Sequence, residues 1–577
     1  MLGRGQLRGC ESGGSLHAPG EYQLLFPNRC PAGCAEREVR ATQRGKNTGL
    51  INIAELGSKT ARYAPHAPAL IDAQRGTART FGQLARRVDV LAMCLVNMFG
   101  PGQRVAVLSP NCIEMVELYL ACAASGSLLF PMNWRFSVAQ LAQALQDADP
   151  VVVFYDKSYE PAIKELTSVI PARAWVSWES GHDSEYEELL RRVAGPGPID
   201  GPPHVSTVLP DPQSLLHQPF LAVSTGGTTG IPKSAVHSQH SYAACALNYL
   251  GAARVAQTDV YLMLGQLFHV VGYMPLAYLA AGRPVVIANF NAAELVDIIG
   301  QERVSGFFAV ATMLPQLMGA VRSAGVGLPS IRQVEYGGAP MGEAVIREAA
   351  ELFVGADLIQ AWGMSELGPG TYLGPEDHRK ALAGDHPHRL RSCGRSALLS
   401  TVAVLDESGR PVPQDTTTVG EICHRGPGNM LGYWNMPEET AELLRDGWVH
   451  SGDVGTWDAD GYVYVVDRLK SMIICGGENI FPAEVERALS DHPEIAEVAV
   501  VSAPDPTWGE LVKAMVVRRQ GSSLDAAAVT AFAEDRLGSY KKPRIVEFVD
   551  ALPITPTGKV DRRAAASPAG AGMGSPS

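Results

Sequence analysis

The stretch that decides the fold is residues 224–238, with the sequence "STGGTTGIPKSAVHS". Glycine, threonine and lysine at this density are typical of a loop that wraps around phosphate. The nucleotide-binding pattern of Gly, four residues, Gly, Lys and Ser or Thr does not fit, because Pro232 precedes Lys233 where that pattern has glycine. The flanking residues 220–223 and 234–237 favour two strands. We therefore expect a strand-to-strand loop that grips phosphate with its own N–H groups, hydroxyls and lysine; a mobile surface loop is the alternative.

Composition excludes several classes of protein. The 577 residues are 46% hydrophobic and 19% charged, which is ordinary for a folded globular chain of several domains. The net charge of −12 disfavours a broad nucleic-acid surface. No apolar run approaches the ~18 residues of a membrane span, so we expect peripheral membrane contact at most. The 10 cysteines lack the spacing of a disulfide framework, which indicates reduced thiols and a cytoplasmic location.

The middle of the chain alternates between two kinds of pattern. Strand-like and helical stretches follow one another at 104–108, 112–124, 151–155, 285–288 and 293–301. This alternation predicts an α/β fold, with helix-covered sheets in a large domain of several subdomains at 49–467. Residues 1–48, rich in Gly, Arg and Cys, are expected to be disordered or a spurious extension, and 567–577 a flexible tail.

The pattern of predicted strands and helices changes from Thr456 onward. The sequence "WDADGYVYVVDR" at 457–468 predicts a hairpin with an Asp-Gly turn. An amphipathic helix after a proline is expected at 481–493, and a strand at 495–501. Together these elements outline a small, mobile α+β domain, to which we assign residues 468–566.

Two clusters offer groups that suit a nucleotide. The sequence "YGGAP" at 336–340 follows a strand and lets the backbone approach a flat ligand. The sequence "QAWGMSE" at 360–366 provides an aromatic face at Trp362 and a carboxylate, Glu366, that suits Mg²⁺. Taken singly, Trp362 is as well explained as a core aromatic and Glu366 as a solvated carboxylate.

Two further clusters lie closer to the C-terminus. The sequence "HSGD" at 450–453 places Asp453 in a tight loop, where it suits ribose hydroxyls. The sequence "PITPTGKVDRR" at 553–563 holds Lys559 in a Thr-Gly turn, from which an ammonium group can reach into a cleft. A surface lysine is the ordinary alternative for Lys559.

In this order, the clusters resemble the AMP-forming acyl-CoA synthetases of the adenylate-forming superfamily. The resemblance covers roughly 50–563 and includes "MNWRF" at 132–136, "GEICHRGPGNMLGYWNMPEET" at 420–440 and "DRLKSMIICGGENIFPAEVE" at 467–486. It implies that a carboxylate attacks the α-phosphate of MgATP to give an acyl-adenylate and pyrophosphate, after which the thiol of coenzyme A displaces AMP. ATP, Mg²⁺ and coenzyme A are thus the implied cofactors, and the opening loop is the implied phosphate loop.

The resemblance also implies roles for individual residues. Lys559, Glu366 and His269 are the implied catalytic residues, with Glu366 as the Mg²⁺ ligand. Lys470 is the implied hinge of the small domain, and Gly476, Gly477 and Glu478 serve the thioester step. The residues implied to bind ATP or AMP are Thr225, Gly226, Gly227, Thr228, Thr229, Gly230, Lys233, Gly337, Gly338, Ala339, Trp362, Gly363, Ser365, Asp453 and Arg468.

Departures from the family pattern are small. Trp362 stands where the family usually has tyrosine, Ser234 replaces a glycine, and Ser451 replaces a threonine. His269 follows Phe268 where amino-acid-activating relatives need a carboxylate, and only 18 residues follow Lys559, which leaves no room for a carrier domain.

The acyl group is expected to be apolar. The residues that suggest an apolar pocket are Val270, Val271, Gly272, Met313 and Leu367. A medium- or long-chain fatty acid is the first expectation. The alternatives are an aryl-CoA ligase, an acyl-AMP ligase that loads a carrier protein, and a non-catalytic adenylate-binding protein.

Overall fold

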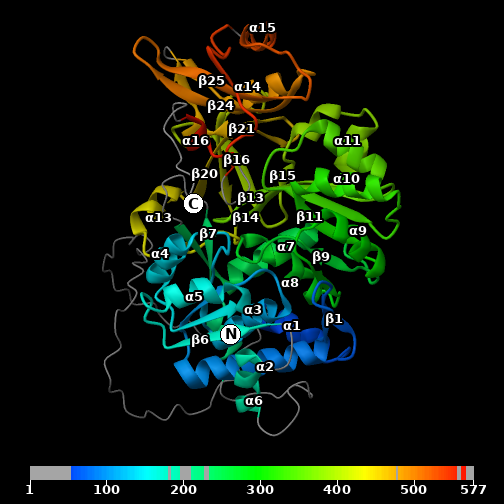
Figure 1. The fold of residues 1–577 in the computed structure, drawn as a ribbon, viewed down its shortest axis with the longest axis vertical. Coiled ribbons are helices and arrows are strands. Elements are labelled where there is room, and N and C mark those ends of the chain that lie inside the picture. The colour runs from blue at the N-terminus through cyan, green and yellow to red at the C-terminus, as the bar shows by residue number, and fades with distance from the viewer. Residues whose placement is uncertain are drawn as a thin grey trace, which may run out of the picture. The chain divides into compact units, whose positions relative to one another are not determined.

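A computed structural model describes residues 53–179, 184–194, 209–225, 233–475, 478–537, 539–554 and 560–566. The expectations for 1–48 and 567–577 lie outside these residues. The described chain forms four sheets with helices against them (Figure 1). The predicted fold class, α/β with a large N-terminal part and a small α+β C-terminal part, is confirmed. Among the described helices, none combines the length and apolar character needed to cross a bilayer.

The largest sheet has nine strands in the order β15-β14-β13-β12-β11-β9-β10-β1-β2. Neighbouring strands between β13 and β1 in this order pair in parallel. Strands β2, β14 and β15 are antiparallel to their neighbours. The strands are β1 Pro68–Asp72, β2 Thr77–Thr80, β9 Tyr261–Met263, β10 Val285–Ile287, β11 Gly306–Val310, β12 Gln333–Gly337, β13 Asp357–Met364, β14 Gly368–Leu373 and β15 Arg395–Ser396. The carboxyl ends of β11, β12 and β13 therefore meet at one edge, where ligands of parallel sheets bind.

A second sheet has seven strands in the order β18-β8-β7-β4-β3-β5-β6. Its strands are β3 Arg104–Leu108, β4 Leu128–Pro131, β5 Val152–Asp156, β6 Ala174–Trp178, β7 Pro219–Thr225, β8 Lys233–Ser238 and β18 Gly432–Tyr433. The two strands predicted to flank the opening loop are thus confirmed as β7 and β8, which pair antiparallel.

Helices fill the space between these sheets and cover their outer faces. The helices of the large part are α1 Ile53–Ala61, α2 Phe81–Phe99, α3 Ile113–Ser125, α4 Val138–Ala148, α5 Glu160–Leu166, α6 Glu185–Ala194, α7 Gln239–Ala252, α8 Tyr273–Ala280, α9 Ala292–Gln301, α10 Met313–Ala324, α11 Glu343–Leu352, α12 Pro375–Leu382 and α13 Pro437–Leu443. One core cluster joins α1, α2, α3, α7 and α8 to strands of both sheets. A second covers the other face of the nine-stranded sheet with α9, α10 and α11, and a third covers the seven-stranded sheet with α4 and α5. The layers therefore alternate between helices and sheets.

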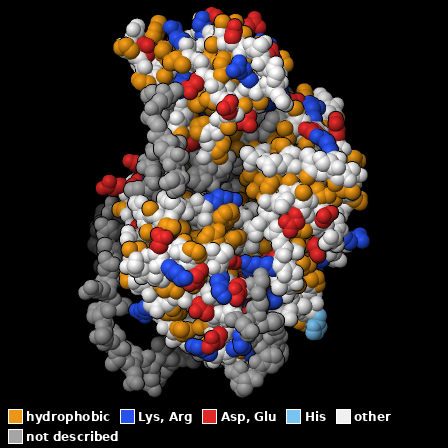
Figure 2. Space-filling view, viewed as in Figure 1, with side chains coloured by type: hydrophobic (Ala, Val, Ile, Leu, Met, Phe, Trp, Pro, Cys, Tyr) orange, Lys and Arg blue, Asp and Glu red, His pale blue; other side chains and the backbone are white. Residues whose placement is uncertain are grey.

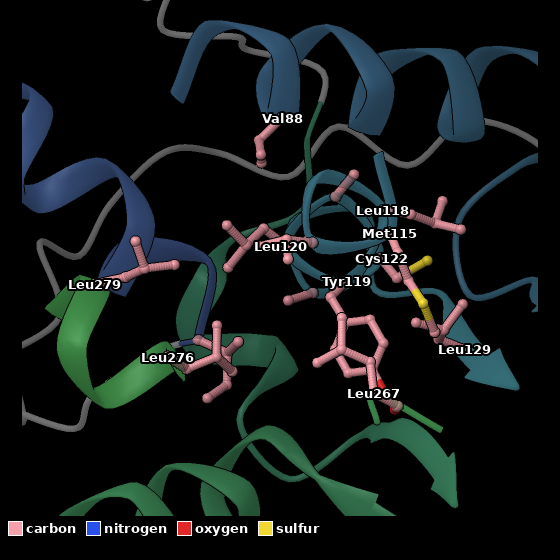
Figure 3. Packing of buried hydrophobic residues seen from close by; sticks show 14 of the residues in the cluster. Val88, Met115, Leu118, Tyr119, Leu120, Cys122, Leu129, Leu267, Leu276 and Leu279 are labelled. Atoms are coloured by element: carbon pink, nitrogen blue, oxygen red, sulfur yellow. The ribbon is translucent and has the colours of Figure 1, made fainter. Parts of the chain in front are cut away.

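Helix α3 is central to this arrangement because apolar residues surround it. Figure 3 shows its side chains between Val88 of α2 and Leu276 and Leu279 of α8. The hydroxyl of Tyr119 on α3 donates to the carbonyl oxygen of Leu267. Apart from Glu114 and Glu117 the helix is almost entirely apolar, which is expected of a helix in a core.

The third sheet corrects one expectation. It contains β16 Thr401–Leu405, β17 Gly420–Arg425, β19 Leu444–Arg445, β20 Trp448–Trp457 and β21 Val463–Arg468. The hairpin predicted at 457–468 is real, with Gly461 at φ 82° in its turn. However, its first strand pairs with β17, so the hairpin belongs to this sheet and not to the small domain that it was expected to help outline.

The small C-terminal part has a sheet of its own. Its strands are β22 Ile473–Cys475, β23 Glu478–Ile480, β24 Ile495–Asp505, β25 Gly509–Arg518 and β26 Ile545–Phe548, and its helices are α14 Pro482–Ser490, α15 Ala526–Arg536 and α16 Arg562–Ala566. The helix expected after the proline and the strand after it are confirmed as α14 and β24. The domain boundary between 467 and 468 stays a prediction.

Charged side chains of both signs are interspersed on the face shown in Figure 2. Several form surface pairs, such as Lys157 with Glu179 (2.9 Å) and Arg192 with Glu188.

Candidate active site

The candidate phosphate loop leaves and re-enters the second sheet at a paired position. Strand β7 ends at Thr225 and β8 begins at Lys233, and these two residues are antiparallel partners. The rest of the predicted loop, including Gly226, Gly227, Thr228, Thr229 and Gly230, lies outside the described residues. The sheet therefore fixes both ends of the loop.

Glu366 and Lys233 both contact Tyr433. The Tyr433 hydroxyl donates to Glu366 Oε1 at 2.6 Å, and the Lys233 ammonium lies 5.0 Å from the centroid of the Tyr433 ring. Glu366 is 5% exposed, and burial raises the pKa of its carboxyl. The Tyr433 hydrogen bond and the charges of Arg468 and Lys233 act against that rise and favour the ionised form. The result is a buried carboxylate beside two cations.

The backbone around Glu366 is held by its neighbours. The imidazole Nε2 of His237, on β8, lies 2.7 Å from the carbonyl oxygen of Ser365. Burial lowers the pKa of His237 to about 4, so the ring is neutral at pH 7 and can donate to Ser365 through Nε2–H. On the other side, the Met430 N–H donates to the Glu366 carbonyl oxygen at 2.8 Å. Glu366 is therefore fixed through its main chain as well as its carboxyl.

Trp362 and Arg468 converge on Asp453. The indole Nε1–H of Trp362 donates to Asp453 Oδ2 at 2.9 Å, and Arg468 Nε forms an ion pair with Asp453 Oδ1. Asp453 and Arg468 are antiparallel partners on β20 and β21. Asp453 is only 6% exposed, so its charge is compensated where it is buried.

The segment before Asp453 lies within β20, with an irregular register against β17, and not in the tight loop that was expected. The Ser451 hydroxyl donates to the Ile422 carbonyl oxygen at 2.5 Å and accepts from the Asp453 N–H at 3.0 Å. Serine thus makes both hydrogen bonds that a threonine hydroxyl would make at this position. Glu421 Oε1 accepts from the Gly452 N–H at 3.0 Å.

Glu421 also belongs to a group with metal-ligating atoms. With Cys423 and His450 it offers three such atoms within 4.8 Å of one another. His450 Nδ1 lies 2.7 Å from Glu421 Oε2 and 2.9 Å from Arg445 Nη2. Because the Arg445 guanidinium brings positive charge to the same nitrogen, we interpret this group as a hydrogen-bond network that supports the part of β20 before Asp453.

The predicted glycines lie where strands approach one another closely. A Cβ on Gly337 would lie 2.4 Å from the Ala361 carbonyl oxygen, and one on Gly363 would lie 2.0 Å from that of Gly368. Gly338 has φ 75°, which favours glycine, and the following Ala339 is exposed. This edge therefore presents bare backbone at the carboxyl ends of β12 and β13.

The remaining predicted residues lie in other places. His269 is half-buried before the short 3₁₀ helix Val270–Gly272, with its ring centroid 4.4 Å from that of Phe268. Lys470 is exposed in the 3₁₀ helix Leu469–Ser471, between the third and fourth sheets. Glu478 is exposed at the start of β23. Gly476, Gly477 and Lys559 lie outside the described residues.

The structure thus brings together Lys233, Glu366, Trp362, Asp453 and Arg468. Sequence reasoning missed Tyr433 and His237. Both lie inside quoted motifs, but the sequence carries no signal that Tyr433 reaches a residue 67 positions earlier.

Comparisons with known proteins agree over most of the chain. The model of the AMP-binding enzyme family matches residues 58–434, and that of the AMP-binding enzyme C-terminal domain matches 484–559. Feruloyl-CoA synthase from an Amycolatopsis species is 36% identical over 516 residues, covering 88% of this chain and 97% of that protein. Indoleacetate–CoA ligase from Aromatoleum aromaticum is 36% identical over 497 residues, covering 83% and 91%. A Mycobacterium tuberculosis fatty acyl CoA synthetase structure matches with a TM-score of 0.70 and 28% identity, covering 89% and 97%.

Proposed function

Because the chain belongs to the AMP-binding enzyme family, as an AMP-forming acyl-CoA synthetase that uses ATP, Mg²⁺ and coenzyme A, we propose that its acid substrate is apolar and that an aromatic acid is preferred to a fatty one. The enzyme joins a small carboxylic acid to coenzyme A at the expense of ATP. The observation that carries the proposed site is the convergence of Tyr433 on the buried Glu366, and of Trp362 and Arg468 on the buried Asp453.

In this proposal, Asp453, Arg468 and Trp362 hold the nucleoside. The buried carboxylate of Asp453 suits the ribose hydroxyls, and Arg468 compensates its charge. The Trp362 ring packs against Gly370, where a Cβ would lie 2.7 Å from the indole Cζ3, so the indole is held in one position. The exposed Gly338, where a Cβ would meet only Val310 Cγ1 at 3.6 Å, leaves room for a flat base beside it.

Glu366 fits the proposed Mg²⁺ ligand. Mg²⁺ takes hard oxygen ligands, and a ligating carboxylate is normally oriented by a hydrogen bond such as the one from Tyr433. When bound, the ion supplies positive charge against the oxygens of the leaving pyrophosphate. Lys233, fixed at the base of the phosphate loop, adds positive charge from the protein.

The proposed role of Lys559 is to bring the anionic carboxylate to the α-phosphate, and that of His269 is to line the path of the nucleophile. Lys470 would serve as the hinge about which the small domain moves between the two steps, exchanging Lys559 for the segment from Gly476 to Glu478. The exposed position of Lys470 between two sheets suits that role.

The preference for an aromatic acid rests on the layer between the nine-stranded sheet and helices α7 and α8. Four buried tyrosines of this layer come from the two helices, namely Tyr242, Tyr249, Tyr273 and Tyr278. Planar rings in such a layer pack well against a planar acyl group. The relatives named for feruloyl and indoleacetate substrates support the same choice, whereas the Mycobacterium structure is named for a fatty acyl substrate. A medium- or long-chain fatty acid therefore stays the alternative.

We also propose a cytoplasmic location. The seven cysteines that the structure describes are all free and buried. Free thiols suit a reducing compartment.

The test is to incubate the protein with MgATP, coenzyme A and a panel of aromatic and fatty acids, and to follow AMP, pyrophosphate and thioester by mass spectrometry. Thioester and AMP with aromatic acids in preference to fatty acids is the expected result. Lys559→Ala should lose adenylate formation, while Lys157→Ala, a change in an exposed ion pair, should retain it.

Other outcomes assign other functions. Acyl-adenylate that accumulates without thioester would favour the loading of a carrier protein. Formation of ADP, or no reaction with any acid, would contradict the proposal.

A further inference from the structure

Glu335 is a buried carboxyl that the reaction does not use. It lies in the middle of β12 and is 2% exposed. Its Oε1 accepts hydrogen bonds from the Tyr249 hydroxyl and from Gln333 Nε2. Its Oε2 has no hydrogen-bond partner among the described residues. A buried polar atom without a partner raises the free energy of the folded state. We therefore expect this oxygen to bind a group of a ligand.

The surroundings of Glu335 are aromatic and uncharged. Phe308 of β11 and Ile359 of β13 are its neighbours in register. The tyrosines whose hydroxyl pKa values are raised by burial, with a further contribution from Glu335, are Tyr249, Tyr261, Tyr273, Tyr278 and Tyr372. Burial also raises the pKa of Glu335 to about 8, so its neutral form prevails at pH 7. Glu335 is therefore a polar group among buried aromatic rings.

Glu335 lies on the same sheet face as the proposed nucleotide site. It precedes Gly337 by two residues on one strand, so both face the same side at a separation of about 7 Å. A Cβ on Gly337 would lie 3.5 Å from the Phe308 ring. A Cβ on Gly265 would contact both Phe308 and Val271, the latter at 2.7 Å. Phe308 therefore connects the Gly337 end of this face with Val271, close to His269.

We propose that Glu335 lies at the distal end of the acyl pocket and that its unpartnered carboxyl oxygen binds the hydroxyl of a hydroxylated aromatic acid. This inference rests on the proposed function, because the acid must extend from Gly337 along β12. The distance from Gly337 to Glu335 along the strand is comparable to the length of one aromatic ring with its para substituent.

A hydroxyl is the group that satisfies Glu335 in both of its protonation states. It donates to the ionised carboxylate and accepts from the neutral acid. A methyl end leaves Oε2 without a partner, and a second carboxylate brings like charges together in a buried place. A site built to pair with a hydroxyl rejects the analogue that lacks it, because the protein group then stays unpaired.

The experiment compares matched pairs of acids in the full-length protein. The pairs are 4-hydroxycinnamic with cinnamic acid and 4-hydroxyphenylacetic with phenylacetic acid, and the measured quantity is kcat/KM for thioester formation. Wild type is expected to prefer the hydroxylated member by about 10- to 100-fold, because the analogue without the hydroxyl leaves a buried carboxyl oxygen unpaired. Glu335→Leu should abolish or invert this preference. Glu335→Gln, which keeps the shape and one acceptor, should retain part of it and covers the case in which the leucine variant does not fold.

Ile359→Val is the matched control, since it changes the volume at the same register without changing the carboxyl. It should alter both members of each pair by the same factor. Thioester formation by wild type without a hydroxyl preference, or a preference unchanged in both Glu335 variants, would overturn the inference and leave the ligase function intact. Failure of wild type with every acid would overturn the proposed function, and this inference with it.

Discussion

Trp362 donates its indole N–H to Asp453 across 2.9 Å, and so joins the end of β13 to the hairpin β20–β21. The two residues are 91 positions apart. Since Asp453 also pairs with Arg468, the proposed base, ribose and charge-compensating residues form one unit. A change in any of them should therefore affect nucleotide binding more than acid binding.

Trp362→Phe keeps an aromatic ring but removes the donor to Asp453. We expect the KM for ATP to rise about 10-fold, the scale of a hydrogen bond to a charged group, with the KM for the acid nearly unchanged. Steady-state kinetics and calorimetric titration with AMP measure both effects. Trp448→Phe is the control, because Trp448 lies on β20, as Asp453 does, but packs beneath Arg425. An equal loss in both variants would mean that the Trp362 hydrogen bond has no specific role.

Tyr433→Phe removes the hydroxyl that donates to Glu366. The hydrogen bond favours the ionised carboxylate, so its loss should raise the pKa of Glu366 further in the direction set by burial. We expect the acid limb of the pH–rate profile to move to higher pH, and the Mg²⁺ concentration for half-maximal rate to rise about 10-fold.

The control for Tyr433→Phe is Tyr462→Phe, which removes a hydroxyl bonded to Asp377 instead. That variant should keep the wild-type Mg²⁺ dependence. If Tyr433→Phe keeps it too, the hydroxyl does not position Glu366 for the ion.

Local patterns were sufficient to predict some of the strands and helices. The apolar runs on either side of the loop predicted β7 and β8, and the Asp-Gly turn predicted the hairpin at 457–468, because both signals lie within the elements themselves. The sheet to which the hairpin belongs was not predictable. One helix and two short strands intervene between β20 and its partner β17, and no local signal specifies that pairing.

In the candidate site, too, local signals were predictable and long-range contacts were not. Glu366, Asp453 and Trp362 were predicted because their motifs are contiguous. The contacts of Tyr433 with Glu366 and the open oxygen of Glu335 depend on how distant strands pack. A tyrosine or glutamate in an apolar strand gives no indication of its partner, so only the structure could find them.

Glu117 is the centre of a buried ion cluster in the large part. It is 0% exposed and accepts from Arg87 Nε at 2.7 Å, Arg79 Nε at 3.2 Å and the Tyr186 hydroxyl at 2.6 Å. Burial alone would raise its pKa, but Arg87 and Arg79 outweigh burial and lower it. Glu117→Ala should destabilise the fold by about 3 kcal/mol, because it leaves the buried Arg87 with only one of its two carboxylate partners, Glu187.

The measurement is the urea midpoint and Tm, with KM values as a check that the site is intact. Because the pKa of Glu117 is lowered on folding, its contribution is present at neutral pH and is lost only as the pH falls through that lowered value. Glu188→Ala, which breaks an exposed pair with Arg192, should cost about 0–1 kcal/mol. Similar losses in both variants would show that the cluster adds little.

Glu335 should make stability depend on pH in the opposite sense. Burial raises its pKa from 4.5 to about 8, so between these values the folded chain holds a proton that the unfolded chain has released. Stability from this group is full below pH 4.5 and is lost as the pH rises to about 8. Glu335→Gln keeps the acceptor for Tyr249 and Gln333 but has no proton to lose, so its Tm should gain on wild type steadily from pH 5 to pH 8. Glu343→Gln is the comparison, since Arg347 lowers the pKa of that carboxyl and its Tm difference should be flat over this range. A Tm difference for Glu335→Gln that is constant with pH would mean that the carboxyl is already ionised in the folded chain. Oε2 would then have a partner that the described residues do not provide.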